Sequence, residues 1–212
     1  MKALKVLFFD VGYTLINEDE VWHRRCIEQA ESDEAKALGL TPEQIYEEIV
    51  QASLMHLPQY RTVIRKFGFR NPAPYRHELE QLYEDAVPAL ESLAEKYQLG
   101  IIANQTDGLQ QRLRNLGVDK YFRYVISSWD CGVMKPDPEI FRIALKRAEC
   151  APEEAMMVGD RLDNDIRPAK GLGFRTTWIK KGFGGLQSIS SDGFRPDYIV
   201  HSLQEIAEIL CK

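Results

Sequence analysis

The segment Leu4–Thr14 reads LKVLFFDVGYT and joins a short apolar run to a polar loop that contains a glycine. The apolar part, Leu4–Phe9, is nearly continuous and has no helical spacing, which is typical of a strand buried on both faces of a parallel sheet. Asp10 ends this run, and Gly12 marks a turn directly afterwards. We therefore expect a central strand that stops at a carboxylate.

Five more short apolar runs follow along the chain, and segments with helical spacing separate them. Strands that alternate with helices form a parallel sheet with helices on both faces. The sequence therefore predicts the α/β fold class. The expected strands cover residues 99–103, 124–127, 155–158, 176–179 and 198–200, and the expected helices cover residues 86–96, 108–116, 137–149, 163–171 and 203–211.

Residues 17–88 interrupt this alternation. The stretch is rich in Glu, Gln, Arg and His, and its apolar residues recur at helical spacing. Thr41 and Pro42 are residue types preferred just before and at the first turn of a helix. No segment here has a convincing strand pattern. We expect a small all-helical domain of three or four helices, inserted after the first strand into a core made of residues 1–16 and 89–212.

The composition is that of an ordinary globular protein with a mildly acidic surface. Hydrophobic residues make up 44% of the 212 residues, and the net charge is −5. A nucleic-acid binder would need a basic face, so we expect a small-molecule substrate and no nucleic-acid partner. The four cysteines are scattered, which argues against zinc and disulfides and favours a reducing, cytoplasmic location. No apolar stretch is long enough to span a membrane, and the oligomeric state is left open.

The first two expected strands end at polar residues. In parallel α/β sheets, ligands bind just beyond the carboxyl ends of the strands. Asp10 ends the first strand, where it either caps the next turn or acts as a carboxylate nucleophile that Thr14 orients. Asn104 and Gln105 follow the second strand, where they either form a polar loop ahead of a helix or donate hydrogen bonds to a phosphoryl oxygen.

The later strand ends carry the charges that a phosphoryl-transfer site needs. Lys135 lies between Met134 and Pro136, just ahead of an expected helix, where a fixed ammonium group can neutralise a phosphoryl group. Asp160 and Asp165 belong to a run of three acids within six residues, which repel one another unless a cation or hydrogen-bond donors satisfy them. Mg²⁺ prefers a few carboxylate oxygens and several waters, so these two acids are candidate ligands.

Taken together, the strand-end residues resemble the four motifs of the haloacid dehalogenase-like hydrolase superfamily. The segments GVMKPDPEIF (132–141) and VGDRLDNDI (158–166) are especially similar to that family. The helical insertion lies where the family places its first type of cap. The resemblance implies a Rossmann-like core under a helical cap, and a magnesium-dependent phosphatase that acts on a small phosphorylated metabolite.

The resemblance also assigns roles to individual residues. It implies that Asp10 attacks phosphorus and forms an aspartyl-phosphate, while Lys135 screens the charge. The implied ligands of Mg²⁺ are Asp10, the backbone carbonyl of Gly12, Asp160 and, behind them, Asp165.

Two positions depart from the family's pattern. Most of its phosphatases carry a second Asp two residues after the nucleophile as acid/base, where this chain has Gly12, and a Ser or Thr where it has Ala103. A lost acid/base group costs roughly 10²–10⁴ in rate. We therefore expect a slow phosphatase, or one restricted to good leaving groups, whose activity rises on Gly12→Asp substitution. The alternatives are hydrolysis of a non-phosphate bond, as in the family's dehalogenases and phosphonatases, and a binding or regulatory protein.

Other residues are weaker candidates. Asp107, His23 and His56 are residue types that could replace the missing proton group, but each is more often a surface or capping residue. Tyr13 is expected to pack under the cap and not to donate into the site.

The selection of substrate is expected to come from the cap, which closes over the site and excludes water. Trp22, Arg24 and Arg25 are candidate lining residues, although amphipathic helix faces explain them equally well. The glycine-rich segment 181–185 lacks phosphate-loop spacing and is expected to be a plain surface loop.

Overall fold

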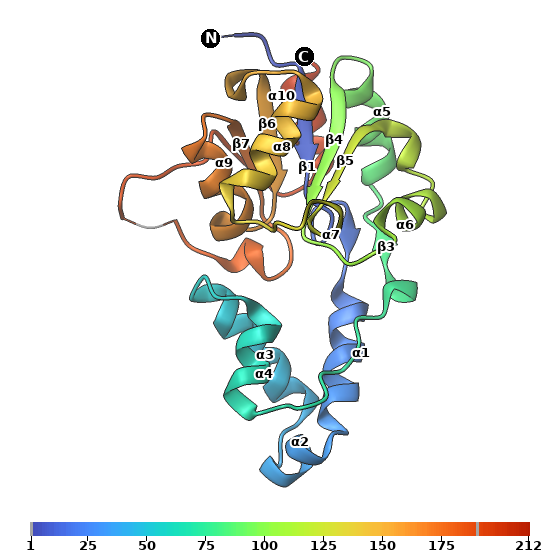
Figure 1. Ribbon diagram of the computed structural model, residues 1–212, viewed down its shortest axis with the longest axis vertical. Coiled ribbons are helices and arrows are strands. Elements are labelled where there is room, and N and C mark those ends of the chain that lie inside the picture. Colours follow the sequence, from blue (N-terminus) through green and yellow to red (C-terminus); the bar gives the residue numbers. More distant parts are fainter. Residues whose placement is uncertain (1, 190) are drawn as a thin grey trace.

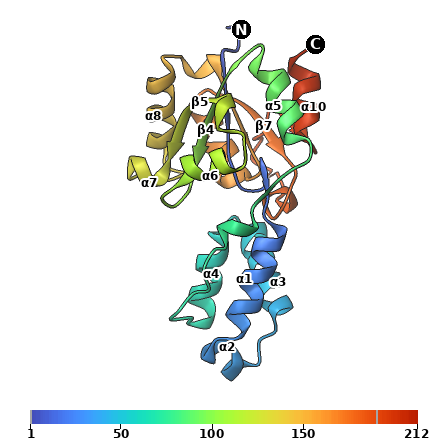
Figure 2. The same ribbon diagram turned by 90° about the vertical axis from the view of Figure 1, so that its right-hand side faces the viewer.

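The computed structural model describes residues 2–189 and 191–212 and has two stacked parts (Figures 1 and 2). An α/β core carries both ends of the chain, and a group of helices lies at its opposite end. We call this group, together with the segments that join it to the core (residues 18–80), the cap. No helix among the described residues combines the length and the apolar character needed to cross a membrane.

The core is built on a six-stranded parallel sheet in the order β5-β4-β1-β6-β7-β8. When only these six strands are counted, this is the Rossmann order, which reverses beside β1. β1 pairs with β4 on one side and β6 on the other, so the strand predicted to be central is central. The predicted Rossmann-like α/β fold is confirmed. The strands are β1 (Val6–Phe9), β4 (Gln98–Ala103), β5 (Phe122–Ser127), β6 (Ala155–Gly159), β7 (Arg175–Ile179) and β8 (Tyr198–Val200).

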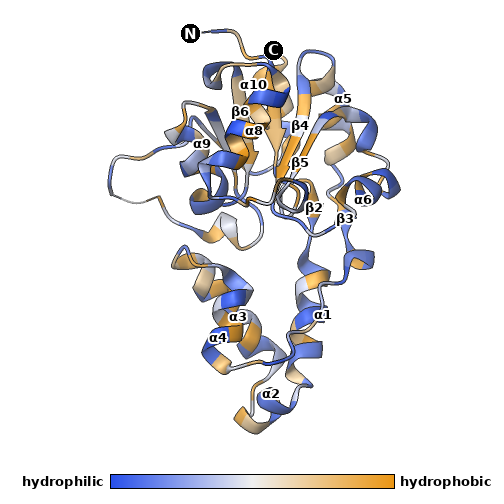
Figure 3. Ribbon diagram, viewed as in Figure 1, coloured by the Kyte–Doolittle hydropathy of each residue, from blue (hydrophilic) through white to orange (hydrophobic). Residues whose placement is uncertain are grey.

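Helices cover both faces of the sheet because the side chains of β1 alternate between two apolar clusters. Leu7 and Phe9 pack in the cluster that includes α5 and α10, whereas Val6 and Phe8 pack in the cluster that includes α8. Figure 3 shows strongly apolar strands at the centre of the core. The core helices are α5 (Ala86–Ala94), α6 (Leu109–Asn115), α7 (Ser128–Cys131), α8 (Pro138–Ala148), α9 (Arg167–Gly171) and α10 (Leu203–Leu210), with short 3₁₀ turns at His77–Leu79, Asp119–Tyr121, Pro152–Glu154 and Gly184–Leu186.

The expected strands and helices of the core are present with ends shifted by at most two residues, with one exception. The segment expected as a helix over 163–171 begins as a π turn, Leu162–Ile166, and only then continues as α9. This turn returns the Asp165 side chain toward the end of β6, where its Oδ2 accepts a hydrogen bond from the Arg161 N–H at 3.0 Å.

The cap consists of four helices packed around their own apolar cluster. Thr41 and Pro42 start α3 as predicted, because the Thr41 hydroxyl accepts from the Gln44 N–H while the Gln44 side chain accepts from the Thr41 N–H. The four helices are α1 (Asp19–Ala30), α2 (Asp33–Leu38), α3 (Pro42–Leu54) and α4 (Gln59–Phe67).

The chain passes between core and cap through a short antiparallel ribbon of β2 (Ile16–Asn17) and β3 (Gln81–Leu82). The expectation that the insertion holds no strand missed β3, because two residues are too few to show a period. The expected boundary between residues 88 and 89 falls inside α5, and Ala86 already packs in the core cluster. The division into domains remains a prediction, and its second boundary is better placed before Ala86.

The glycine-rich segment after β7 is not a plain surface loop. Gly184 and Gly185 are buried, and Phe183 packs within the apolar cluster of the cap. A side chain on Gly182 would overlap the ring of Tyr13, and one on Gly184 would overlap Asp160. The prediction of a plain surface loop is wrong. These glycines allow segments that are distant in the sequence to pack closely, and such packing leaves no recognisable spacing in the local sequence.

Candidate active site

Three acids from distant parts of the chain meet at the carboxyl ends of β1 and β6. Asp10, Asp160 and Asp165 each offer a carboxylate oxygen, and these oxygens lie within 4.8 Å of one another. The Asp10 N–H donates to the Val158 carbonyl at 2.9 Å, which ties the end of β1 to its neighbour β6. The convergence predicted from separate strand ends is therefore present.

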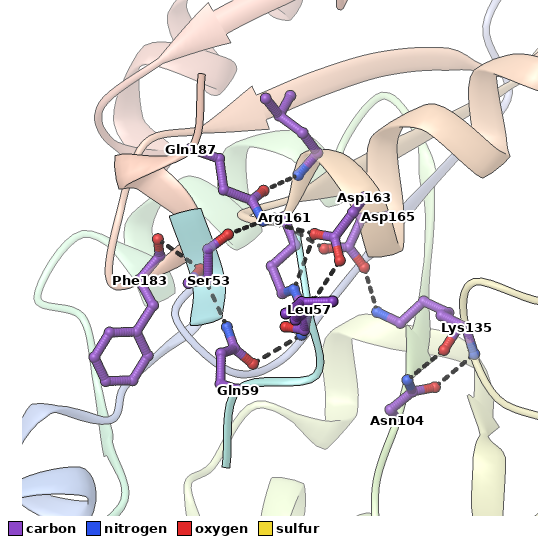
Figure 4. A network of polar contacts seen from close by, with 11 residues as sticks. Ser53, Leu57, Gln59, Asn104, Lys135, Arg161, Asp163, Asp165, Phe183 and Gln187 are labelled. Atoms are coloured by element: carbon purple, nitrogen blue, oxygen red, sulfur yellow. Dashed lines mark hydrogen bonds and ion pairs between the residues drawn. The ribbon is translucent and has the colours of Figure 1, made fainter. Parts of the chain in front are cut away.

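Lys135 is buried between two of these acids. Its Nζ lies 2.7 Å from Asp10 Oδ1. The same Nζ lies 2.5 Å from Asp165 Oδ1, a contact that Figure 4 shows. Burial alone would lower the pKa of Lys135, but the two carboxylates outweigh it and raise the pKa. The lysine therefore stays charged and fixed beside Asp10.

The acid cluster fits a divalent cation. Burial, together with the negative charges of Asp165 and Asp10, raises the pKa of Asp160 well above its usual range. Burial also raises the pKa of Asp165 to about 6, although Lys135 opposes this shift. One lysine does not compensate three close carboxylates, and oxygen donors of this kind suit Mg²⁺.

Asn104 and Gln105 lie beside the acids but are already engaged with the protein. The Asn104 side chain accepts from the Lys135 N–H at 2.7 Å and donates to the Lys135 carbonyl at 2.8 Å, so it holds the lysine loop against the end of β4. The Gln105 N–H donates to Ser128 Oγ at 3.0 Å. An amide has two N–H donors, so Asn104 keeps one for a ligand, and the phosphate-binding role of both residues remains a prediction.

Thr14 and Asp165 lie behind the site and not in its wall. Thr14 is fully buried, and its hydroxyl has no hydrogen-bond partner within the described chain. Both Asp165 oxygens are already occupied, one by Lys135 and the other by the Arg161 N–H. The structure therefore supports Asp165 as an anchor of the lysine, while its contact with a metal and the role of Thr14 remain predictions.

A cavity of about 440 Å³ opens above the acids and reaches into the cap. Of the candidate cap residues, Trp22 and Arg25 line it, whereas Arg24 is exposed elsewhere on α1. The candidate proton groups Asp107, His23 and His56 do not line it. The cavity is walled by Asp10, Gly12, Tyr13, Glu18, Trp22, Arg25, Gln59, Tyr75, His77, Asn104, Gln105, Thr106, Ser128, Met134, Lys135, Asp160, Arg161, Asn164 and Phe183.

Tyr13 packs as predicted. It is buried in the apolar cluster of the cap, with its ring centroid 5.3 Å from that of Phe183. Its hydroxyl donates to Asp19 Oδ1 at 3.0 Å and is not presented to the acids.

Glu18 fills the space left by the missing side chain at position 12. A Cβ atom placed on Gly12 would lie 2.6 Å from Glu18 Oε1 and 2.9 Å from Oε2. Glu18 immediately precedes α1 and lines the cavity together with Asp10. The absence of an acid at position 12 is thus accompanied by an acid from the cap at nearly the same place.

The Glu18 carboxylate is held by neutral donors. The Tyr75 hydroxyl donates to Oε1, and the Trp22 indole N–H donates to Oε2 at 3.1 Å. Burial raises the pKa of Glu18 to about 7, against the opposing effect of these two hydrogen bonds. No ion pair joins Glu18 to a basic side chain in the part of the chain that the structure describes. Sequence analysis missed this residue because an acid ahead of a helix usually serves only the helix dipole.

A polar network joins the cap to the core beside the acids (Figure 4). Arg161 pairs with Asp163 at 2.5 Å and donates to Gln59 of the cap at 2.8 Å. Ser53 Oγ donates to the Phe183 carbonyl at 3.0 Å, and Gln187 donates to the Ser53 carbonyl at 3.0 Å. These contacts hold the cap over the cavity in this arrangement.

Comparison with known proteins agrees with this geometry. The glyceraldehyde 3-phosphate phosphatase of Methanocaldococcus jannaschii is 39% identical over 141 residues, which cover 65% of this chain and 56% of that protein. The glyceraldehyde 3-phosphate phosphatase of Methanopyrus kandleri is 29% identical over 230 residues, which cover 98% of this chain and 97% of that protein. The crystal structure of a HAD phosphatase from Thermococcus onnurineus superimposes with a TM-score of 0.69 at 26% identity and covers 98% of each chain. Because the model of the haloacid dehalogenase-like hydrolase family matches residues 7–179, most of its length, this chain belongs to that family, as its motifs predicted.

Proposed function

We propose that this protein is a magnesium-dependent phosphatase that removes the phosphoryl group from a small phosphorylated metabolite. The observation that carries the proposal is the meeting of Asp10, Lys135 and Asp160 at the floor of one cavity. A carboxylate nucleophile, a fixed cation and a metal-binding acid are the groups that phosphoryl transfer to an aspartate requires. The relatives named as phosphatases support the same reaction class.

The roles of the core residues follow from their positions. Asp10, Asp160 and the backbone carbonyl of Gly12 would hold Mg²⁺, with Asp165 behind them. The ion would supply positive charge that neutralises the phosphoryl oxygens. Lys135 fixes the Asp10 carboxylate and screens its repulsion from the incoming phosphate.

The reaction has two steps. An Asp10 oxygen bonds to phosphorus while the bond from phosphorus to the ester oxygen breaks, and the departing oxygen takes up a proton. Water then attacks the phosphorus of the aspartyl-phosphate and gives up a proton, which frees inorganic phosphate and restores Asp10. Both steps need a group that moves a proton near the leaving oxygen.

Glu18 is the residue whose geometry suits this proton transfer. Its carboxylate stands where a side chain at position 12 would stand, and it lines the same cavity as Asp10. Gly12 alone led us to expect a slow or restricted phosphatase. We now propose instead that Glu18 of the cap supplies the group that transfers the proton. The limitation to good leaving groups should appear only when Glu18 is removed.

A substrate screen with a metal control tests the proposed function. Small phosphate monoesters should be hydrolysed in Mg²⁺ and not in EDTA, and haloacids should remain intact. Hydrolysis of haloacids without phosphatase activity would favour the alternative of a non-phosphate hydrolase. Absence of any turnover would favour a binding or regulatory protein.

Leaving-group dependence tests Glu18. Glu18→Gln should slow hydrolysis of an alkyl phosphate by roughly 10²–10⁴ and that of an activated aryl phosphate far less, because only the poor leaving group needs the proton. Glu20→Gln is the matched control, since Glu20 is an exposed acid only two residues farther along the chain, in the first turn of α1. Equal losses on both substrates would rule out a proton role for Glu18.

A side-chain exchange sharpens this test. Gly12→Asp alone should give no gain, because its Cβ would lie 2.6 Å from Glu18 Oε1. Combined with Glu18→Ala, the same substitution should recover alkyl phosphatase activity lost in Glu18→Ala. A gain from Gly12→Asp alone would show that Glu18 does not occupy the functional position.

A further inference from the structure

One side of α1 forms the cap wall of the cavity. Glu18 directly precedes α1, and Trp22 and Arg25 follow it by four and seven residues, so the three lie on the same side of the helix, and all three line the cavity. A helix rises about 1.5 Å per residue, which places Arg25 about 10 Å farther along α1 than Glu18. Since α1 leads away from the core (Figure 1), the cavity extends from the acids at its floor to a guanidinium group in the cap.

Arg25 has no acidic partner among the described residues, and in this respect it differs from the rest of the cavity wall. The other basic side chains there each contact a carboxylate: Lys135 contacts Asp10 and Asp165, Arg161 contacts Asp163, and His77 contacts Glu80. A partly buried charge without a counter-ion is costly. An anion that enters the cavity would supply the missing partner.

The surroundings of Arg25 hold it in place without neutralising it. Its guanidinium carbon lies 3.6 Å from the centre of the Tyr60 ring and 5.3 Å from that of Trp22. Its Nε donates to the Ala73 carbonyl at 2.9 Å. Aromatic rings and a carbonyl stabilise a cation only in part, and burial lowers the pKa of Arg25. A planar guanidinium group presents paired donors that match the two oxygens of a carboxylate or phosphate.

We propose that Arg25 forms a second anion-binding subsite, so that the preferred substrates are small phosphate monoesters with a carboxylate or second phosphate at the far end. The inference rests on the proposed function, because the first phosphoryl group must lie at Asp10. Trp22 and Phe183 also line the cavity, with ring centroids 5.5 Å apart, and offer apolar contact to a short carbon chain.

Binding of non-hydrolysable phosphonates tests this subsite without catalysis. Calorimetry in Mg²⁺ compares propylphosphonate, 3-phosphonopropionate and propane-1,3-diphosphonate, which share a three-carbon chain and differ at the far end. The native protein should bind the ligands with a second anion about 10- to 100-fold more tightly, as expected for hydrogen bonds to a charged group. The tighter of the two identifies the second group as carboxylate or phosphate.

Variants of α1 attribute the preference to one residue. Arg25→Gln should remove the preference and leave the affinity for propylphosphonate unchanged, whereas the exposed neighbour Arg24→Gln should behave like the native protein. Arg25→Lys keeps the charge but loses the planar pair of donors, so it should retain only part of the preference. This variant replaces Arg25→Gln as the test if Arg25→Gln does not fold.

The outcomes separate the two proposals. Equal affinities in the native protein, or a preference that survives in Arg25→Gln, would overturn the subsite and leave the proposed function standing. Failure of all three ligands to bind, together with no turnover of any phosphate monoester, would overturn both.

Discussion

The two walls of the cavity differ in how their charges are satisfied. On the core side, Lys135 forms ion pairs with both Asp10 and Asp165. On the cap side, Glu18 and Arg25 lie among aromatic rings, and neither has an oppositely charged partner in the described chain. The comparison indicates that the core holds the reacting groups rigidly, while the cap keeps charges available for the substrate.

The largest effect is expected on the core side. Asp10→Asn should lower turnover at least about 10³-fold for every phosphate substrate, because no other group forms the covalent intermediate. Steady-state kinetics on an aryl and an alkyl phosphate measures this, and the loss should not depend on the leaving group. A variant that retains native turnover would exclude Asp10 as the nucleophile.

Removal of the positive charge of Lys135 should lower the stability of the protein as well as its activity. Lys135→Met leaves the buried Asp165 and the partly buried Asp10 without their partner and should lower the free energy of unfolding by about 3–5 kcal/mol without added metal. The cost should be smaller at acidic pH, where Asp165 is protonated, since its pKa already lies at about 6. Chemical denaturation measures it against the exposed control Lys146→Met. Equal stability of the two variants would contradict a stabilising role for the ion pairs of Lys135.

Metal affinity should depend on the core and not on the cap. Asp160→Ala should weaken Mg²⁺ binding more than about tenfold, whereas Arg25→Gln should leave it unchanged. Calorimetry with Mg²⁺ alone gives both values without any substrate. Identical titrations of native protein and Asp160→Ala would remove the metal from the core site.

The smallest effect concerns the pH dependence of stability on the cap side. Because burial raises the pKa of Glu18 from 4.5 to about 7, the folded protein keeps a proton there that the unfolded chain releases. The free energy of unfolding should therefore fall as pH rises through this window, by about 1 kcal/mol per pH unit from this group. Glu18→Gln should show a correspondingly smaller decrease in denaturation experiments between pH 5 and 7. If the free energy of unfolding of native protein and of Glu18→Gln changed with pH in the same way, this would contradict a buried, protonated Glu18.

The core half of the site could be predicted from the sequence because its information is local. Each strand is a short apolar run, and Asp10, Asn104 and Asp160 each follow directly after one, so the strand-end rule places these three residues together. Even for these residues, the sequence does not distinguish a side chain that contacts the ligand from one that only holds another residue in place. Asn104 holds the loop of Lys135, a role visible only in the hydrogen bonds between them.

The cap half could not be predicted because it depends on contacts between distant segments. Glu18 is an ordinary acid before a helix until Gly12 is seen to leave room for it. Phe183 reaches the cap through a hydrogen bond that joins positions 130 residues apart. The sequence predicts Arg24 and Arg25 as equal candidates to line the cavity, and only the orientation of α1 separates the exposed Arg24 from Arg25 in the cavity.

Trapping the covalent intermediate tests the central claim most directly. Glu18→Gln, reacted with an acyl phosphate in Mg²⁺ and quenched in acid, should accumulate a phosphoryl group, because the good leaving group departs without a proton while attack by water is slowed. Mass spectrometry of the proteolysed protein should find this group on the peptide that contains Asp10, and should find none when Asp10→Asn is added. Hydrolysis that proceeds with no modified Asp10, or with the phosphoryl group on another residue, would contradict the account.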